Sequence, residues 1–428
     1  MWGTATSSHQ VEGGNTNNQW HAWEQASKVE RGEVSGLAAD WWGGRWREDF
    51  DRAAEAGQNA HRFSIEWSRI QPTADRWDDE ALDHYVQMAK GALARGLQPV
   101  VTLHHFTHPL WLDELGGWEY EGTPALFEAY TRRVVSALKE HVSLWCTINE
   151  PNILVVVGYV VAYFPPQVTD IGRAFSVAHN LLRAHAASYH AIHEIQPGAR
   201  VGLAHHYRGI KPARPGHPLD RLLARIQSRF FNDFFVDGVA TGKLRLLQHS
   251  ARVPQARGTQ DYFGLNYYTE DEVRFAWRPA EAFGARAFRQ DAEVSPHNFM
   301  ANEPLGFRRA LLWANRYGLP IIVTENGAED ERDDFRRRYL LLQVQQLWRL
   351  VNVNTPIEVY FHWSLVDNFE WDRGWQQRFG LWELDIETQA RRKRTSANLY
   401  AAICQSNGFS TELVQQYAPD VFDEMFPV

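Results

Sequence analysis

The chain has 428 residues, of which 44% are hydrophobic, and this is enough apolar material for a sizeable core. Its formal net charge of −8 at pH 7 argues against nucleic-acid binding, which requires a clustered basic surface. With two cysteines, no secretory signal at the start, and no apolar run of the about 20 residues that cross a membrane, we expect a cytoplasmic protein without a membrane partner.

Eight short segments have the β-branched and aromatic composition of strands. In chain order they cover residues 2–10, 59–67, 98–106, 144–150, 199–207, 261–269, 319–326 and 357–365. Amphipathic helical patterns lie between them, with apolar residues at three- and four-residue spacing, for example at 45–57, 80–96, 125–141, 176–194 and 336–351.

Glycines close two of these helical patterns, at Gly57 and Gly96, where a left-handed cap is expected. Eight strands that alternate with helices predict a parallel sheet, and the count of eight favours its closure. We therefore expect an α/β protein in which residues 1–428 form a single-domain (β/α)8 TIM barrel, with the active site at the C-terminal ends of the strands.

Nearly every predicted strand ends in polar or aromatic residues. These are Gln10, Glu66, His104, His105, Asn149, Glu150, His205, His206, Asn266, Glu325, Asn326 and Trp363. Chance could place polar residues at the ends of two or three strands, but it does not explain polar ends on eight strands. In a barrel all these ends surround one opening, which is where such folds build their active sites.

Two of the three carboxylic acids among these residues have similar surroundings in the sequence. Glu150 and Glu325 each follow an apolar strand directly, and each has an Asn as neighbour. On the fourth and seventh strands their carboxyl groups could lie roughly 5 Å apart, the separation expected of a retaining glycosidase. A lone acid at a barrel rim is as often part of a salt bridge as of an active site, but two acids so placed weaken that alternative.

The pair suits double displacement. One glutamate attacks the anomeric carbon while the other protonates the leaving oxygen, and water then reverses the roles. The neighbouring negative charge makes the second acid hold its proton, and that acid becomes a base once the first is esterified.

Seven motifs in order along almost the whole chain resemble glycoside hydrolase family 1, the β-glucosidase and β-galactosidase family. They are "GTATSSHQVEGG", "HRFSIEWSRI", "TLHHFTHP", "TINEPN", "GLNYYT", "VTENGA" and "HWSLVDNFEW" followed by "RFG". The resemblance implies that Glu150 is the acid/base and Glu325 the nucleophile.

The resemblance also implies roles for the surrounding residues. Arg62 should lie beside the nucleophile and keep it ionised, Asn149 should bind the sugar 2-hydroxyl, and Tyr268 should hydrogen-bond the nucleophile. The sugar pocket is expected to contain Gln10, His105, Asn266, Trp363, Glu370, Trp371 and Phe379. In this scheme Trp363 supports the ring, and Glu370, as an ionised carboxylate, accepts from two hydroxyls.

The same motifs narrow the activity. Glu370 would repel a phosphorylated sugar in a desolvated pocket, so a neutral glycone is expected. The acid Glu150 argues against the family's thioglucosidases, which lack it. The function predicted is an exo-acting retaining β-glycosidase that hydrolyses terminal non-reducing β-D-glucosyl residues, and β-galactosyl or β-fucosyl residues, possibly with transglycosylation.

The sequence departs from the family pattern in three places. Few residues precede the first Trp-Gly pair, so the first strand is expected to be short. Met300 stands where a tryptophan usually lines the leaving-group side, and this leaves the aglycone open. Histidines such as His104 and His105 replace other residues of the third motif, but adjacent strand residues point to opposite faces, so no metal site is expected and no cofactor is needed.

Two alternatives remain open. One is a catalytically weak sugar-binding barrel, against which the presence of both acids and Arg62 argues. The other is an endo-acting barrel glycosidase, which needs an open cleft and which Gln10 and Glu370 disfavour. The partner expected in each case is a small-molecule glycoside or oligosaccharide, and the oligomeric state is left open.

Overall fold

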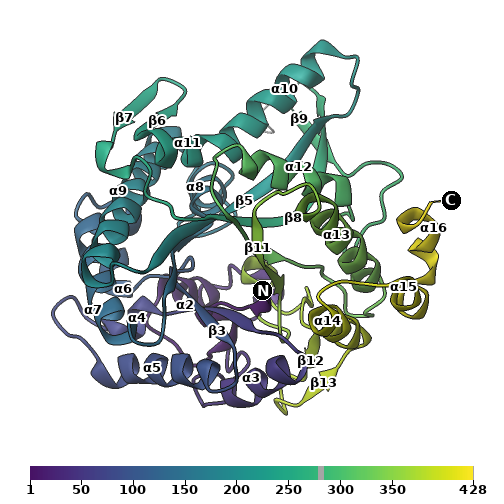
Figure 1. The fold of residues 1–428 in the computed structure, drawn as a ribbon. Coiled ribbons are helices and arrows are strands. Elements are labelled where there is room, and N and C mark those ends of the chain that lie inside the picture. Colours follow the sequence, from purple (N-terminus) through teal and green to yellow (C-terminus); the bar gives the residue numbers. More distant parts are fainter. Residues whose placement is uncertain (278–283, 428) are drawn as a thin grey trace.

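A computed structural model describes residues 1–277 and 284–427, and it shows a barrel of parallel strands surrounded by helices (Figure 1). Within these residues eight strands form a closed ring, because β10 pairs with both β11 and β8. In ring order they are β1 (Trp2–Ala5), β2 (Ala60–Ser64), β3 (Gln98–His104), β4 (Leu144–Asn149), β5 (Arg200–Pro212), β8 (Phe263–Phe275), β10 (Ile321–Asn326) and β11 (Ile357–Trp363). The expected (β/α)8 barrel is confirmed.

The strands are connected by helices on the outside of the ring. The predicted helical patterns correspond to α3 (Trp46–Glu55), α5 (Asp79–Leu93), α7 (Thr123–Leu138), α9 (Ile171–Ile195) and α13 (Phe335–Val351). The Asp78 side chain caps α5 by accepting from the Ala81 amide at 2.9 Å. Gly57 and Gly96 have φ values of 73°, as expected of left-handed caps.

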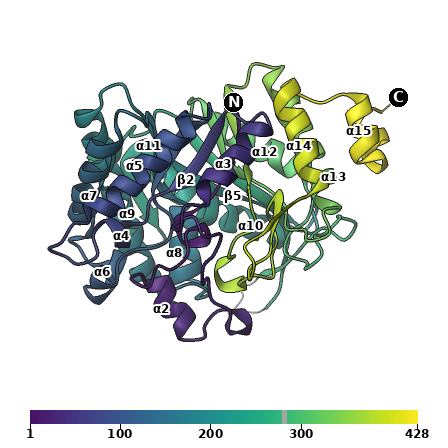
Figure 2. The same ribbon diagram turned by 90° about the horizontal axis from the view of Figure 1, so that it is seen from below.

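The remaining helices complete the outer layer or surround the opening. They are α1 (Ser8–Val11), α2 (Gln19–Gln25), α4 (Trp67–Ile70), α6 (Leu110–Glu114), α8 (Pro151–Tyr159), α10 (Pro218–Ser228), α11 (Phe234–Thr241), α12 (Pro304–Asn315), α14 (Thr395–Ser406), α15 (Thr411–Tyr417) and α16 (Phe422–Met425). Figure 2 shows the N-terminus and α14 at one end of the barrel, with α2 and α6 at the other. None of the helices within the described residues is long and apolar enough to span a membrane.

Several strand boundaries differ from the sequence prediction. The first strand ends at Ala5, and part of the segment predicted as strand is the helix α1, because the Ser8 amide donates to the Ser64 hydroxyl at 2.7 Å instead of continuing the ladder. The strands β5 and β8 are longer than predicted, and β9 (Gly284–Ala287) pairs antiparallel with β8 outside the ring. Two hairpins lie outside the barrel, β6 (Lys243–Leu246) with β7 (His249–Arg252), and β12 (Trp382–Leu384) with β13 (Arg391–Lys393).

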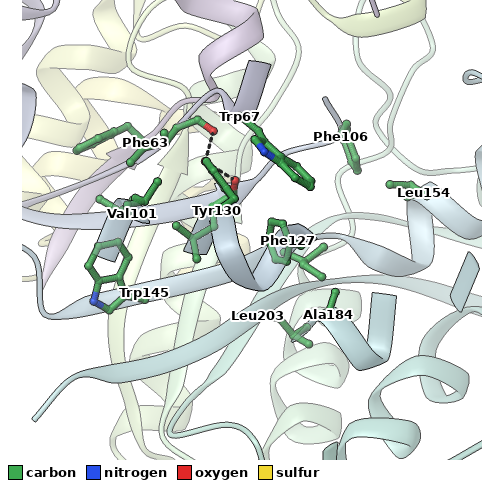
Figure 3. Packing of buried hydrophobic residues seen from close by; sticks show 14 of the residues in the cluster. Phe63, Trp67, Val101, Phe106, Phe127, Tyr130, Trp145, Leu154, Ala184 and Leu203 are labelled. Carbon is green, nitrogen blue, oxygen red and sulfur yellow. Dashed lines mark hydrogen bonds between the residues drawn. The ribbon is translucent and has the colours of Figure 1, made fainter. Parts of the chain in front are cut away.

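Alternation along the strands divides the core into two layers. Between the ring and helices α7 and α9 lie Phe63, Val101, Trp145, Leu203, Phe127, Tyr130 and Ala184 (Figure 3). The Tyr130 hydroxyl donates to the carbonyl oxygens of Ile65 at 3.3 Å and Leu103 at 3.1 Å. Inside the ring a second cluster includes Ala60, Val100, Leu144 and Ile322, so the barrel is filled with side chains below the opening.

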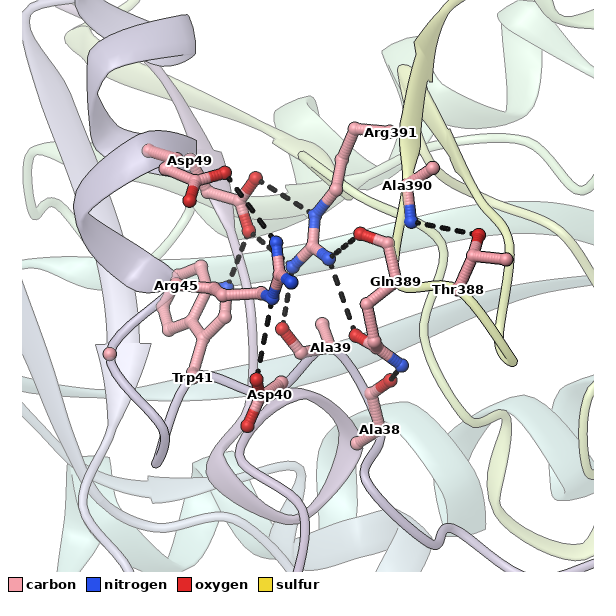
Figure 4. Close-up of polar contacts among 12 residues, drawn as sticks. Ala38, Ala39, Asp40, Trp41, Arg45, Asp49, Thr388, Gln389, Ala390 and Arg391 are labelled. Atoms are coloured by element: carbon pink, nitrogen blue, oxygen red, sulfur yellow. Dashed lines mark hydrogen bonds and ion pairs between the residues drawn. The ribbon is translucent and has the colours of Figure 1, made fainter.

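A buried polar network joins the early and late parts of the chain (Figure 4). The Arg391 guanidinium contacts an Asp49 carboxylate oxygen at 3.0 Å and the carbonyl oxygen of Ala39 at 2.5 Å. The Trp41 indole N–H donates to the same Asp49 oxygen at 2.8 Å. Because both charged side chains are buried and paired, this contact fixes the loop before α3 against the β12–β13 hairpin.

Candidate active site

A cavity of about 220 Å³ opens at the C-terminal ends of the barrel strands. Its wall contains residues from six strands or from the positions that follow them, namely His105, Asn149, Glu150, His206, Tyr268, Glu325 and Trp363. Polar side chains at the ends of different strands therefore meet at one site, as the sequence pattern indicated.

Glu325 lies at the end of β10 and is held from two sides. Its Oε1 accepts from the Arg62 guanidinium at 2.6 Å, and its Oε2 accepts from the Tyr268 hydroxyl at 2.6 Å. Burial raises the pKa of Glu325 to about 7, and the charge of Glu150 adds to this rise, while Arg62 and Tyr268 oppose it. Arg62 therefore stabilises the ionised form without restoring the ordinary pKa of the carboxyl group.

Arg62 on the second strand connects the third, fourth and seventh strands of the ring. It is fully buried on β2, and its Nη2 donates to the Asn149 side-chain oxygen at 2.6 Å. Its Nε donates to the Thr102 hydroxyl at 3.0 Å, and its Nη1 also donates to the Thr324 carbonyl at 3.2 Å. The planar guanidinium is thus fixed in orientation and fixes the partners that it contacts.

Glu150 follows β4 in an uncommon backbone conformation, with φ 45° and ψ 57°. A left-handed conformation costs free energy in a non-glycine residue, and such strain is concentrated at functional positions. Pro151 then begins α8, so the chain turns from strand to helix at the carboxylic acid itself. Oxygen Oε1 of Glu150 accepts from the Asn266 amide at 2.8 Å and contacts Nδ1 of His206 at 2.9 Å.

Glu150 and Glu325 line the same cavity, and the charge of the first raises the pKa of the second. The strands β4 and β10 that carry them are separated in the ring by β5 and β8. Their separation of roughly 5 Å stays a prediction, as do the catalytic roles of Glu150, Glu325, Arg62, Asn149 and Tyr268.

Aromatic rings and one imidazole form part of the cavity wall. His105 lies nearly parallel to Trp363 and to Trp371, with ring centroids 6.0 Å apart in each pair. Nε2 of His105 contacts the Asn149 amide nitrogen at 3.1 Å, and burial lowers the pKa of His105 well below its usual value. The imidazole is therefore neutral and accepts at Nε2, and its Nδ1–H has no partner among the described residues.

Glu370 corrects one expectation. Burial, together with the charges of Asp372, Glu325 and Glu150, raises the pKa of Glu370 to about 8. At neutral pH this side chain is therefore mainly a carboxylic acid, not the ionised carboxylate expected from the sequence. It can donate one hydrogen bond as well as accept.

Three predicted site residues lie one layer behind the cavity wall, namely Arg62, Gln10 and Asn266. The Gln10 amide nitrogen donates to the Phe369 carbonyl at 2.8 Å and to Glu370 Oε2 at 3.3 Å. Its amide oxygen accepts from the Ser7 hydroxyl at 2.6 Å. In this structure Gln10 thus supports Glu370 from behind, and direct contact with a sugar stays a prediction.

The cavity wall includes residues that the sequence analysis did not assign to the site. They are Phe106, Ile153, Val157, Tyr163, Phe164, His206, Arg208, Thr269, Phe299, Asp372 and Arg373. His206 stood at a predicted strand end, but no catalytic or sugar-binding role was predicted for it. Met300, which was singled out, is buried and lines the cavity, where its sulfur accepts from the Glu329 amide at 3.5 Å.

The histidines near the opening do not gather around one point. His104 accepts at Nε2 from the Trp118 indole at 3.1 Å, on the other side of β3 from His105. In the described parts of the chain, no group of three or more His, Cys, Asp or Glu side chains could hold a metal ion.

Gly327 follows the Glu325-Asn326 pair because no side chain fits there. A Cβ atom at this position would lie 1.8 Å from the Trp363 carbonyl oxygen. The turn after β10 therefore packs directly against the backbone that carries Trp363, so the positions of Glu325 and Trp363 depend on each other.

Comparison with known proteins identifies the family. The model of "Glycosyl hydrolase family 1" matches residues 1–409. "Beta-glucosidase A" of Thermotoga maritima is 30% identical over 95% of this chain and 97% of its own, and "Beta-galactosidase" of Sulfolobus acidocaldarius is 30% identical over 93% and 91%. The solved structure of a "beta-glycosidase from Pyrococcus horikoshii" superposes with a TM-score of 0.91 at 37% identity, covering 97% of this chain and 96% of that one.

Both the full-length family match and the barrel with its two glutamates point to one conclusion. The chain belongs to glycosyl hydrolase family 1 and is an O-glycoside hydrolase of the β-glucosidase type, that is, a β-glycosidase.

Proposed function

We propose that the protein is a retaining, exo-acting β-glycosidase that removes terminal non-reducing β-D-glucosyl residues, and related galactosyl or fucosyl residues, from small glycosides. The observation that carries the proposal is the unequal environment of the two acids in one cavity. Glu325 contacts a cation and a phenol, whereas Glu150 is held through Oε1 alone by His206 and Asn266.

In the first step a carboxylate oxygen of Glu325 forms a bond to the anomeric carbon. The bond between this carbon and the leaving oxygen breaks, and the proton of Glu150 moves to that oxygen. Arg62 and Tyr268 stabilise the Glu325 carboxylate before attack, and Asn149 is available to the sugar 2-hydroxyl, a contact that strengthens in the transition state.

In the second step water attacks the anomeric carbon and gives a proton to Glu150, and the ester to Glu325 breaks. Since the ester carries no charge, Glu150 now loses its negative neighbour and can act as a base. An alcohol in place of water would give transglycosylation. Two inversions at one carbon leave the product with the original anomeric configuration.

The buried residues of the cavity wall support exo action on a neutral sugar. Trp363 and Phe379 are buried and line the cavity together with Glu370 and Trp371. An endo-acting enzyme would need the cavity to continue past these residues. A mainly uncharged Glu370 suits sugar hydroxyls, because it can both donate and accept.

The wall beside Glu150 supports an apolar leaving group. Helix α8 begins directly after Glu150 and contributes Ile153 and Val157, while Phe164 and Phe299 complete this apolar wall. Each methylene group that is fully buried gains about 0.8 kcal/mol, which corresponds to roughly fourfold in kcat/KM. Alkyl glucosides of increasing length should therefore show increasing kcat/KM, and Val157→Asn should reduce this dependence on chain length.

We also propose that the protein is located in the cytoplasm and that residues 1–428 form a single domain that unfolds cooperatively. Two relatives with 30% and 32% identity, from Homo sapiens and Cavia porcellus, are named "Cytosolic beta-glucosidase", and both cysteines are free and buried. Cell fractionation tests the location, and a single calorimetric unfolding transition tests the cooperative unit.

The central test is direct identification of the nucleophile. A 2-deoxy-2-fluoro glucoside with a good leaving group should inactivate the enzyme and add one glycosyl mass to the peptide that contains Glu325. The variant Glu325→Gln should show neither turnover nor label. A label on another residue, or an inverted anomer as the first-formed product in proton NMR, would refute the mechanism.

Product analysis separates the alternatives. Release of monosaccharide only from a long oligosaccharide supports exo action, whereas internal fragments would indicate the endo-acting enzyme. Binding of glucose without turnover of any aryl glycoside would indicate a sugar-binding barrel.

A further inference from the structure

We propose that His206 is a positioning residue for acid–base catalysis, whose Nδ1–H holds Oε1 of Glu150 and leaves Oε2 to carry the catalytic proton. The inference rests on the proposed function in which Glu150 is the acid/base. Its basis is the contact of 2.9 Å between His206 Nδ1 and Glu150 Oε1.

The strand register places His206 in the cavity. Asn149 on β4 is paired with Ala204 on β5, and His206 lies two residues further along β5, on the same face. The His206 carbonyl accepts from the Asn152 side chain at 2.8 Å, which fixes the backbone at this point. The position of the imidazole therefore follows from the barrel itself.

Two aromatic rings fix the orientation of the imidazole. It lies over Tyr268 with centroids 5.7 Å apart and an interplanar angle of 25°, and Phe231 meets it edge to face at 5.8 Å. Because the Tyr268 hydroxyl donates to Glu325, the stacked pair places one hydrogen-bonding group against each glutamate.

The surroundings of the second ring nitrogen select the tautomer. Nε2 of His206 is buried and has no hydrogen-bond partner among the described residues. A proton on Nε2 would be a buried donor without an acceptor, which is costly, so the neutral ring with its proton on Nδ1 is favoured. That N–H then donates to Glu150.

Oε1 of Glu150 consequently has two donors, His206 and the Asn266 amide. Two donors occupy the lone pairs of this oxygen, so the proton of the acid form resides on Oε2. Both bonds are also retained when Glu150 becomes a carboxylate in the second step. His206 thus keeps the same oxygen aimed at the substrate through both steps.

Charges around this contact are accounted for. Arg208, two residues along β5, is paired through two hydrogen bonds of 2.6 and 2.8 Å with Asp271. The other titratable and charged groups of the cavity wall are His105, Glu150, Tyr163, Tyr268, Glu325, Glu370, Asp372 and Arg373. Arg62 lies behind Glu325, and His205 adjoins His206 on β5. Replacing His206 with Phe removes one hydrogen bond to Glu150 and leaves the Arg208–Asp271 pair in place.

Two variants separate the hydrogen bond from the ring packing. His206→Phe keeps a ring against Tyr268 but has no donor, and His206→Asn keeps an N–H near the position of Nδ1 but loses the ring. Without the donor the carboxyl group holds its proton more tightly, because the bond favours the charged form. In His206→Phe we expect the alkaline limb of the kcat/KM profile to move up by about 0.5 to 1 pH unit.

The loss of kcat/KM in His206→Phe should be larger for alkyl glucosides, whose poor leaving groups need a general acid, than for nitrophenyl glucosides. His206→Asn should restore most of the wild-type profile. His193→Phe removes a histidine from the outer helix α9 and serves as the matched control with an unchanged profile. Superimposable profiles of His206→Phe and wild type, or equal shifts in Phe and Asn variants, would overturn the inference.

A measurement on the unaltered enzyme covers the case in which His206→Phe does not fold. Nitrogen NMR of histidine-labelled protein, with His206→Asn used to assign the signal, should show that the neutral form of the ring carries its proton on Nδ1. A proton on Nε2 would refute the assignment. If Glu150→Ala lowers activity equally on glycosides with good and with poor leaving groups, the proposed function is refuted. If the loss is larger for poor leaving groups but the His206 tests fail, only the inference about His206 is refuted.

Discussion

The hydrogen bond from Tyr268 to Glu325 gives a quantitative prediction for Tyr268→Phe. The bond is 2.6 Å long and reaches a buried carboxylate, so it is worth about 1.5 to 3 kcal/mol. Since it favours the charged form, its loss should raise the pKa of Glu325 from about 7 by roughly 1 to 2 units. In the proposed mechanism the carboxylate is the nucleophile, so activity should be present above this pKa and be lost as the pH falls through it.

The expected size of the effect follows from the fraction of ionised Glu325. At pH 7 this fraction is about one half when the pKa is about 7, and roughly 1 to 10% when it is 1 to 2 units higher. We therefore expect kcat/KM on a nitrophenyl glucoside to fall about 5- to 50-fold at pH 7, with the difference shrinking at higher pH.

The assay is the pH dependence of kcat/KM between pH 5 and pH 9, because this quantity reports ionisations of the free enzyme. Tyr130→Phe is the control, since it also removes a buried hydroxyl group but lies outside the barrel against α4. An acid limb of Tyr268→Phe that coincides with that of the wild type would show that the bond does not govern ionisation of Glu325.

Other substitutions test separate parts of the site. Glu150→Ala should lower kcat on alkyl glucosides about 10² to 10⁴-fold but on activated aryl glucosides much less, and equal losses would contradict its role as acid. Gly327→Ala should lower the free energy of unfolding by about 1 to 3 kcal/mol and the melting temperature by several degrees, because its Cβ would overlap the Trp363 carbonyl. Gly216→Ala is the control: its Cβ would contact nothing, so neither quantity should fall. Glu370→Ala should lower kcat/KM for glucosides about 10- to 100-fold through lost hydrogen bonds. Glu370→Gln should lower it by less, since an amide also donates and accepts. Similar losses of kcat/KM in the two variants would argue against a mainly neutral Glu370.

Local sequence was sufficient for the architecture because each barrel strand carries its own signal. The segments around Phe63, Val101 and Trp145 are β-branched and aromatic, end in polar residues, and contribute to the same hydrophobic cluster in the structure. The first segment was predicted too long, because the Ser8 amide bonds to a side chain on a different strand, which no local pattern records.

The details of the site depend on contacts between distant segments. The raised pKa of Glu370 results first from its burial and then from the charges of Asp372, Glu325 and Glu150, so it could not be predicted from composition around residue 370. The contact between His206 and Glu150 depends on the register of β4 with β5. Knowing that two strands are neighbours does not supply that register, and so His206 was not assigned to the acid/base.

Closure of the ring has a consequence for biosynthesis. Strand β1 lies between β2 and β11, so the ribosome must produce residues 357–363 before residues 2–5 gain their second neighbour. At about 5 to 20 residues per second this interval is roughly 20 to 70 s. During that time the nascent chain presents an unpaired strand edge at β1, and a second one at β10 once residues 321–326 have been made. Such edges promote aggregation, so chains truncated before residue 357 should depend on chaperones far more than the full-length protein does.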